Sequence, residues 1–141
     1  MPEFRIEHDF LGEKKVPSTA YYGIHTLRAL ENFKAGGRTL QKELVYAIVQ
    51  IKKASANANF ELGLIDSVKK NAIVKACSEI LAGKFDTQFG IDAFQAGSGT
   101  STHMNVNEVI ANRAIEILGG KKGDYKIIHP NDDVNKSQST N

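Results

Sequence analysis

The sequence predicts a single, mainly α-helical domain with a short β element near its N-terminus. The chain has 141 residues, the usual size of one domain. After residue 39, apolar residues recur at steps of three and four in three separate segments, as on the buried face of a helix. Residues 1–38 sustain no single period and are interrupted by glycine and proline, which is typical of short strands and turns.

Composition excludes several classes of protein. Hydrophobic residues make up 41% of the chain and charged residues 24%, as in ordinary globular proteins. The 18 lysines and arginines and the 16 acidic residues leave a net charge of +2 with the signs interspersed, so we expect no nucleic-acid partner. The longest apolar run, residues 44–49, is far below the roughly 20 residues that cross a bilayer, and the first residues contain no signal-peptide core. We therefore expect a cytoplasmic protein with no membrane partner.

The first half of the chain is predicted to contain a helical hairpin after its irregular start. Residues 1–38 are expected to form short strands, turns and one brief helix. A long amphipathic helix is predicted over residues 40–62, and Gly63 stands at the position of its C-cap. Asp66 is predicted to be the N-cap of a second helix that ends before Gly83. The apolar face of the first helix is expected to carry Leu40, Leu44, Ala47, Ile48, Ile51, Ser55, Ala58 and Leu62.

The second half is predicted to be a loop, a glycine-rich segment, a third long helix and a polar tail. Residues 97–102 contain only glycine and hydroxyl side chains, which indicates a flexible loop before a helix at about 104–118. The segment 125–130 has the composition of a short strand. Cys77 falls on the apolar stripe of the second helix, which favours a core thiol over a reactive one. The connecting loop at 84–94 is expected to turn three rings inward, those of Phe85, Phe89 and Phe94.

The glycine-rich loop is a candidate anion site. A helix N-terminus offers free backbone N–H groups and a partial positive charge, and Gly97, Gly99, Thr100 and Ser101 fit such a site. No lysine or arginine lies between residues 90 and 112, so a carboxylate suits this segment better than a polyphosphate. The same residues also fit an ordinary turn with a Ser or Thr N-cap.

The helix after this loop carries an unusual polar face. Asn105, Asn107 and Asn112 are all poor helix formers. Two of them share one face with Ser101 and Glu108. A solvated face would rather use Lys, Glu and Gln, so we predict a buried polar network that holds the loop in place.

The last residues, 129–141, are almost all hydrogen-bonding, without the composition of a disordered tail. Ser139, Thr140 and Asn141 have the chemistry of an N-cap with no helix behind them, so we expect the sequence to be part of a longer protein. No metal site is predicted, because no partner stands at ligand spacing from the other histidines, His8, His25 and His103.

Two long motifs together resemble a known family. GSGTSTHMNVNEVIANRA and HPNDDVNKSQSTN are similar, in this order, to segments of the N-terminal domain of the aspartase/fumarase superfamily, lyases that produce fumarate. FRIEHDFLGEKKVPSTAYYGIHTLRALENF resembles the opening of these enzymes, so the likeness covers essentially the whole chain. The resemblance implies that residues 1–141 form the N-terminal lyase domain, and that the central helix bundle and the C-terminal domain are absent.

The resemblance also implies a site. Thr100, Ser139, Thr140 and Asn141 match family positions that bind the substrate carboxylate and the leaving-group side of the substrate. The proton-abstracting serine belongs to a later domain, so no catalytic residue is expected here and the chain alone should be inactive. The family forms homotetramers and the resemblance implies no cofactor or metal. A possible accessory carboxylate site matches His129, Asn131 and Asp132.

Two activities remain open within this resemblance. The QSTN segment and the opening residues look like the aspartase branch, which eliminates ammonia from L-aspartate to give fumarate, and this is the first expectation. HPNDDVNKS is similar to the corresponding segment of the class II fumarase branch, which hydrates fumarate to L-malate. A third reading, from another class, is a non-catalytic module that binds dicarboxylates or serves only in folding.

Overall fold

The computed structural model describes residues 3–138. A two-stranded antiparallel hairpin, β1 (Phe4–Asp9) and β2 (Gly12–Pro17), precedes the helices α1 (Ile24–Asn32), α2 (Lys42–Glu61), α3 (Ser67–Leu81) and α4 (Thr100–Ile117). There are also two short helical turns, the 3-10 turn η1 (Asp86–Gln88) between α3 and α4 and the π-helical turn η2 (Pro130–Val134) after α4. The mainly helical fold with a β element near the N-terminus is confirmed. Among the described residues, no helix is long and apolar enough to span a membrane.

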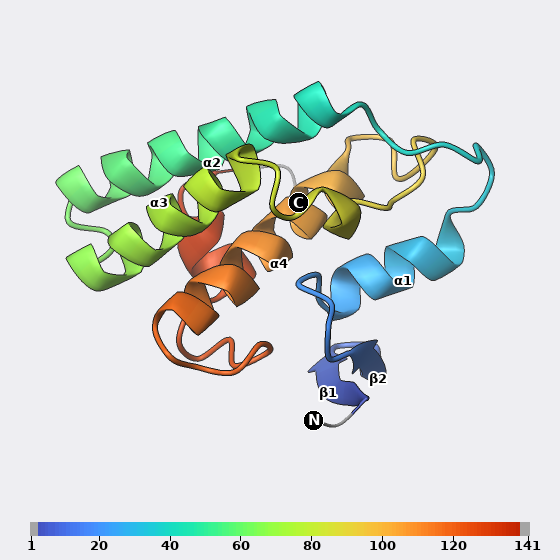
Figure 1. Cartoon of the computed structure of the whole chain (residues 1–141), viewed down its shortest axis with the longest axis horizontal. Coiled ribbons are helices and arrows are strands. Elements are labelled where there is room, and N and C mark those ends of the chain that lie inside the picture. The colour runs from blue at the N-terminus through green and yellow to red at the C-terminus, as the bar shows by residue number, and fades with distance from the viewer. Residues whose placement is uncertain (1–2, 139–141) are drawn as a thin grey trace.

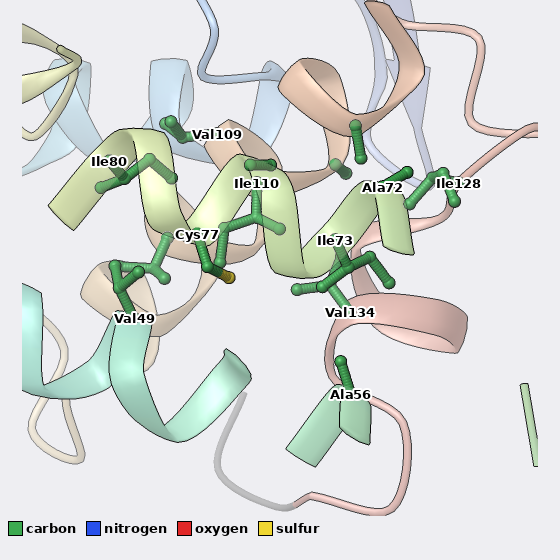
Figure 2. Packing of buried hydrophobic residues seen from close by; sticks show 14 of the residues in the cluster. Val49, Ala56, Ala72, Ile73, Cys77, Ile80, Val109, Ile110, Ile128 and Val134 are labelled. Atoms are coloured by element: carbon green, nitrogen blue, oxygen red, sulfur yellow. The ribbon is translucent and has the colours of Figure 1, made fainter. Parts of the chain in front are cut away.

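Helix α4 lies at the centre of the molecule. Figure 1 shows α2 and α3 side by side, with α4 between this pair and α1, and the hairpin beyond α1. The side chains of Val109 and Ile110 on α4 are fully buried against α2 and α3 (Figure 2), and Val106 on the same helix is equally buried. Burial of this much apolar area is the main term that stabilises such a fold.

The predicted α2–α3 hairpin is confirmed at both of its turn positions. The Asp66 carboxylate accepts a hydrogen bond of 2.8 Å from the Lys69 amide, as an N-cap does. Gly63 follows α2 with φ of +72°, a left-handed conformation that favours glycine. Cys77 is completely buried, and burial raises the pKa of its thiol to about 12, so the prediction of a core thiol is confirmed.

The predicted apolar face of α2 was wrong by about one residue. Leu44 and Ile51 are about half exposed, at 49% and 55%, although both were expected inside. The face that packs on α3 and α4 instead includes two polar residues, and a pattern that seeks only apolar residues misses it. The residues buried on α2 are Val45, Ile48, Val49, Lys52, Ala56 and Asn59.

Three further expectations are corrected. α4 begins at Thr100 rather than near residue 104, because Gly99 turns the chain with φ of +75° and the Gln95 side chain accepts from the Thr102 amide at 2.9 Å. Residues 125–130 form turns rather than a strand, because Ile128 is buried against the helices instead of pairing with another strand. Phe94 is exposed, because its amide bonds the Asp92 carboxylate at 2.8 Å in a tight turn.

Two buried carboxylates join α1 to the rest of the molecule. Glu108 of α4 accepts from the amides of Gly23, His25 and Thr26 at 2.9, 2.9 and 3.1 Å, and from the Thr26 hydroxyl at 2.5 Å. Glu7 of β1 accepts from the next amide in this turn, that of Ile24, at 2.8 Å. These bonds satisfy the first N–H groups of α1, whose N-cap Gly23 has no side chain to do so.

This junction leaves no space for a side chain at Gly23. A Cβ atom there would lie 2.3 Å from the Tyr125 hydroxyl and 2.8 Å from the Glu7 carboxylate. We expect Gly23→Ala to lower the free energy of unfolding by about 2 kcal/mol, the usual cost of overpacking. Urea unfolding measures this change. Gly90→Ala is the matched control, because a Cβ there meets only Leu30 at an ordinary 3.7 Å; equal stability of the two variants would contradict the prediction.

Glu108 is expected to make the protein less stable as pH rises. Burial raises the pKa of this carboxyl from 4.5 to about 7, against the hydrogen bonds from Thr26 and Gly23, which lower it. Between these two pKa values the native state keeps a proton that the unfolded chain has released, so the free energy of unfolding falls as pH rises through this window.

Urea unfolding at about pH 5 and about pH 8 measures this effect. Glu108→Gln should lose this part of the pH dependence, whereas Glu61→Gln, at the exposed end of α2, should keep it. The same pH dependence in Glu108→Gln and in the wild type would refute the assignment.

Candidate functional site

The predicted anion site lies at the start of α4. Its N-cap is Gly99, which has no side chain, so the alternative of an ordinary turn with a Ser or Thr N-cap is not what the structure shows. The Gln95 carboxamide takes that role, because its oxygen accepts from both the amide and the hydroxyl of Thr102, each at 2.9 Å. Within residues 3–138, no hydrogen bond satisfies the amides of Thr100 and Ser101. The helix therefore presents two free N–H groups with the positive end of its dipole.

A hollow of about 380 Å³ lies beside this helix start. Gly97, Gly99 and His103 line it, whereas Thr100 is half-buried at the first position of α4 and is not part of the lining. Burial and the positive charge of Lys52 lower the pKa of His103, which keeps its imidazole neutral at neutral pH. The other lining residues are Leu40, Leu44, Ile48, Ala93, Phe94, Gln95, Ala96 and Thr102.

Two of the three asparagines on α4, Asn105 and Asn112, form the structural network that the sequence predicted. Asn107 does not, because its carboxamide donates only to the Met104 sulfur at 3.7 Å and its oxygen has no partner within residues 3–138. The Asn105 carboxamide donates to the Gln88 carbonyl at 3.1 Å, which fixes the loop before α4. Asn112 donates to the Tyr21 carbonyl at 2.8 Å and accepts from the Gly123 amide at 2.7 Å. Buried amides that are bonded to backbone groups hold loops rigidly. These side chains therefore position the site without lining the hollow at the start of α4.

The predicted accessory residues lie at η2. The Nδ1 atom of His129 accepts from the amides of Asn131 and Asp132, both at 3.1 Å, so the neutral imidazole carries its proton on Nε2. The Asp133 carboxylate accepts from the His129 amide at 2.8 Å and pairs with Lys69 of α3, also at 2.8 Å. This turn is therefore anchored to α3 and held in one conformation.

A second hollow, of about 460 Å³, contains part of the accessory set. His129 and Asn131 line it together with Met104 and Glu108 of α4. The Asp132 side chain is 82% exposed and is not part of the lining. The structure therefore brings His129 and Asn131 to one hollow and leaves Asp132 at the surface.

The two candidate sites occupy different hollows, and α4 contributes to both. Its residues Thr102 and His103 line the first hollow, and Met104 and Glu108 line the second. The predicted substrate residues Ser139, Thr140 and Asn141 lie outside the described residues.

Sequence reasoning missed three residues that shape these regions. Gln95 caps α4, Lys52 of α2 donates through its ammonium to the Asn135 carboxamide oxygen, and Asn59 of α2 donates to the Lys136 carbonyl at 2.9 Å. A lysine and an asparagine seven residues apart, Lys52 and Asn59, were the available signal, because that spacing places both on one face of a helix.

Comparisons with known proteins identify relatives of this chain. A sequence model of a family described as lyase matches residues 12–141. The class II fumarate hydratase of Campylobacter jejuni is 55% identical over 139 residues, and an aspartate ammonia-lyase of a Bacillus species is 52% identical over the same length. Each alignment covers 99% of this chain and 30% of the relative, so the chain spans about a third of the length of the relatives it matches.

Solved structures share the fold. The crystal structure of fumarate lyase:delta crystallin from Brucella melitensis matches with a TM-score of 0.94 and 53% identity, over 97% of this chain and 32% of that one. Class II fumarase from Schistosoma mansoni matches with a TM-score of 0.90 and 43% identity, over 97% of this chain and 29% of that one. Fold, family model and relatives of both activities agree, and the chain belongs to the aspartase/fumarase superfamily of lyases.

Proposed function

We propose that this chain is the substrate-binding N-terminal domain of an aspartate ammonia-lyase, which eliminates ammonia from L-aspartate to give fumarate. The start of α4 carries the proposal: within residues 3–138 two backbone amides there have no partner, and the neighbouring hollow is lined by no lysine or arginine of this described part of the chain. Such a site suits a carboxylate better than a polyphosphate, because hydroxyl and amide donors match a planar group with one charge. Relatives named aspartate ammonia-lyase support this reading.

The chemistry requires donors aimed at one carboxylate. Removing a proton from the carbon beside a carboxylate moves a second negative charge onto that group. Fixed N–H and O–H donors lower the barrier because they stabilise this charge as it forms. The proposed donors are the hydroxyls of Thr100, Ser139 and Thr140, and Asn141 is proposed to contact the amino group.

Further parts of the enzyme are proposed to lie beyond this sequence. The base that takes the proton belongs to a central or C-terminal domain, so the chain by itself is expected to bind a dicarboxylate weakly and to turn over none. The complete enzyme is proposed to be a cytoplasmic homotetramer that needs no cofactor.

Class II fumarase is the second candidate, and the geometry of η2 favours it. His129 keeps its Nδ1 atom occupied by two backbone amides, which leaves the Nε2 proton free to donate to an anion. His129 and Asn131 share one hollow, which is proposed as an accessory carboxylate site; Asp132, which follows Asn131 in the chain, is exposed outside this hollow. A relative named fumarate hydratase class II is 55% identical.

The first test compares two substrates in the complete enzyme that carries this domain. Ultraviolet absorbance follows the appearance of fumarate from L-aspartate and, separately, from L-malate. We expect turnover of L-aspartate alone. Turnover of L-malate alone would replace the first proposal by the second, and turnover of neither substrate would refute both.

The second test addresses Thr100. Thr100→Val keeps the shape of the side chain but removes its hydroxyl, and we expect kcat/KM to fall about 100-fold, as when one oxyanion donor is lost. Thr100→Ser should retain most of the activity because it restores the hydroxyl. Thr87→Val, at an exposed position of η1, is the matched control and should leave kcat/KM unchanged. Full activity of Thr100→Val would remove this residue from the site.

A further inference from the structure

Two polar side chains on the buried face of α2 have no role in the proposed chemistry. Lys52 is 1% exposed and Asn59 is 4% exposed. Seven residues separate them, so both lie on the face of α2 that packs against the core. Burial lowers the pKa of the Lys52 ammonium to about 8, and within residues 3–138 no carboxylate pairs with it. Burying a charge costs free energy unless the charge is paired or hydrogen-bonded.

Both side chains hold the same short segment, residues 135–138. The Lys52 ammonium donates to the carboxamide oxygen of Asn135. Asn59 donates to the carbonyl of Lys136 at 2.9 Å. The Gln138 side chain closes the segment on itself, because it donates to the carbonyls of Val134 and Lys136 at 3.1 and 3.2 Å. α2 therefore forms hydrogen bonds with two successive residues of this segment.

Residues 135–138 include a strained backbone conformation. Ser137 has φ of +61°, and among residues 3–138 it is the only residue other than glycine with a positive φ. A side chain disfavours this left-handed conformation, which persists only where surrounding contacts impose it. On one side, Val134 of η2 packs against Ile73 and Ala56 in the core (Figure 2). The bonds from α2 supply the remaining contacts.

We propose that Lys52 and Asn59 are positioning residues, which hold residues 135–138 in the one conformation from which the chain continues toward substrate-binding residues 139–141. The inference has a structural half, that α2 fixes the conformation of residues 135–138, which rests on the hydrogen bonds from α2. Its functional half, that this conformation supports substrate binding, rests on the proposed function. Lys52 acts through Asn135, because a charge-assisted bond fixes the carboxamide and the backbone that carries it.

The experiment uses four variants of the 141-residue chain. Lys52→Met keeps a long buried side chain but removes the charge, and Asn59→Leu removes the hydrogen bond to the Lys136 carbonyl. Asn135→Leu removes the acceptor of the ammonium, whereas Asn135→Asp keeps an oxygen acceptor there. Lys53→Met and Asn57→Leu are the matched controls, because both residues neighbour the pair on α2 and, within residues 3–138, neither forms a hydrogen bond or ion pair with residues 135–138.

Amide order parameters from nuclear magnetic resonance relaxation measure the structural half. In the wild type, the amides of residues 136–138 should have values of about 0.85, as in rigid backbone, and in Lys52→Met or Asn135→Leu they should fall below about 0.6. Asn135→Asp and both controls should keep the wild-type values. If Lys52→Met fails to fold, Asn135→Leu and Asn59→Leu give the same readout. Rigid residues 136–138 in the folded variants would overturn the proposal.

Titration with fumarate measures the functional half, through the shift of the Thr100 amide signal. We expect Lys52→Met to bind fumarate about tenfold more weakly than the wild type, the effect of one lost charge-assisted bond, and Asn135→Asp to bind it within about twofold. A loss of order at 136–138 with unchanged fumarate affinity would overturn the positioning role. No fumarate binding by the wild type would refute the proposed function instead, while the order parameters would still decide whether α2 holds the segment.

Discussion

Burial of α4 on almost every side is the constraint that the rest of the structure satisfies. α1, α2, α3 and η2 all pack against this helix. A helix that is buried all round must place its polar side chains inside the protein, where each unpaired hydrogen-bonding group costs free energy. Asn105, Glu108 and Asn112 meet this requirement by bonding the backbone of η1, of the start of α1 and of the turn before α1. The polar face of α4 thus fixes the loops around it.

This arrangement explains why both candidate sites adjoin α4. A rigid helix whose side chains bond several loops can fix the geometry of those loops at both hollows. Thr102 and His103 near its N-terminus line one hollow, and Met104 and Glu108 form part of the wall of the other. Glu108 also connects the second hollow to α1, because the carboxylate that lines the hollow caps that helix. Stability and site geometry are therefore coupled through the same carboxylate.

α2 repeats this principle on a smaller scale. Its polar residues Lys52 and Asn59 are buried because they bond the backbone and side chain of a neighbouring segment, and not because they add to the apolar core. Buried polar groups of this kind contribute little net stability, but they select one conformation among several. The left-handed backbone at Ser137 shows that such selection is needed here.

The sequence by itself determined the helical class, a short β element near the N-terminus, the α2–α3 turn and most of the polar face of α4, because periodicity, capping residues and glycines act locally. Its motifs also indicated the superfamily. Only the tertiary structure decided which face of α2 is buried, that α4 starts at Thr100, that Phe94 is exposed, and that Asp132 stands outside the hollow that contains His129. The buried face of α2 depends on partners far away in the chain, such as Asn135 for Lys52, and a local pattern carries no information about such partners. The start of α4 and the exposure of Phe94 depend on bonds between side chains and nearby amides, made by Gln95 and Asp92, which hydrophobic periodicity does not detect.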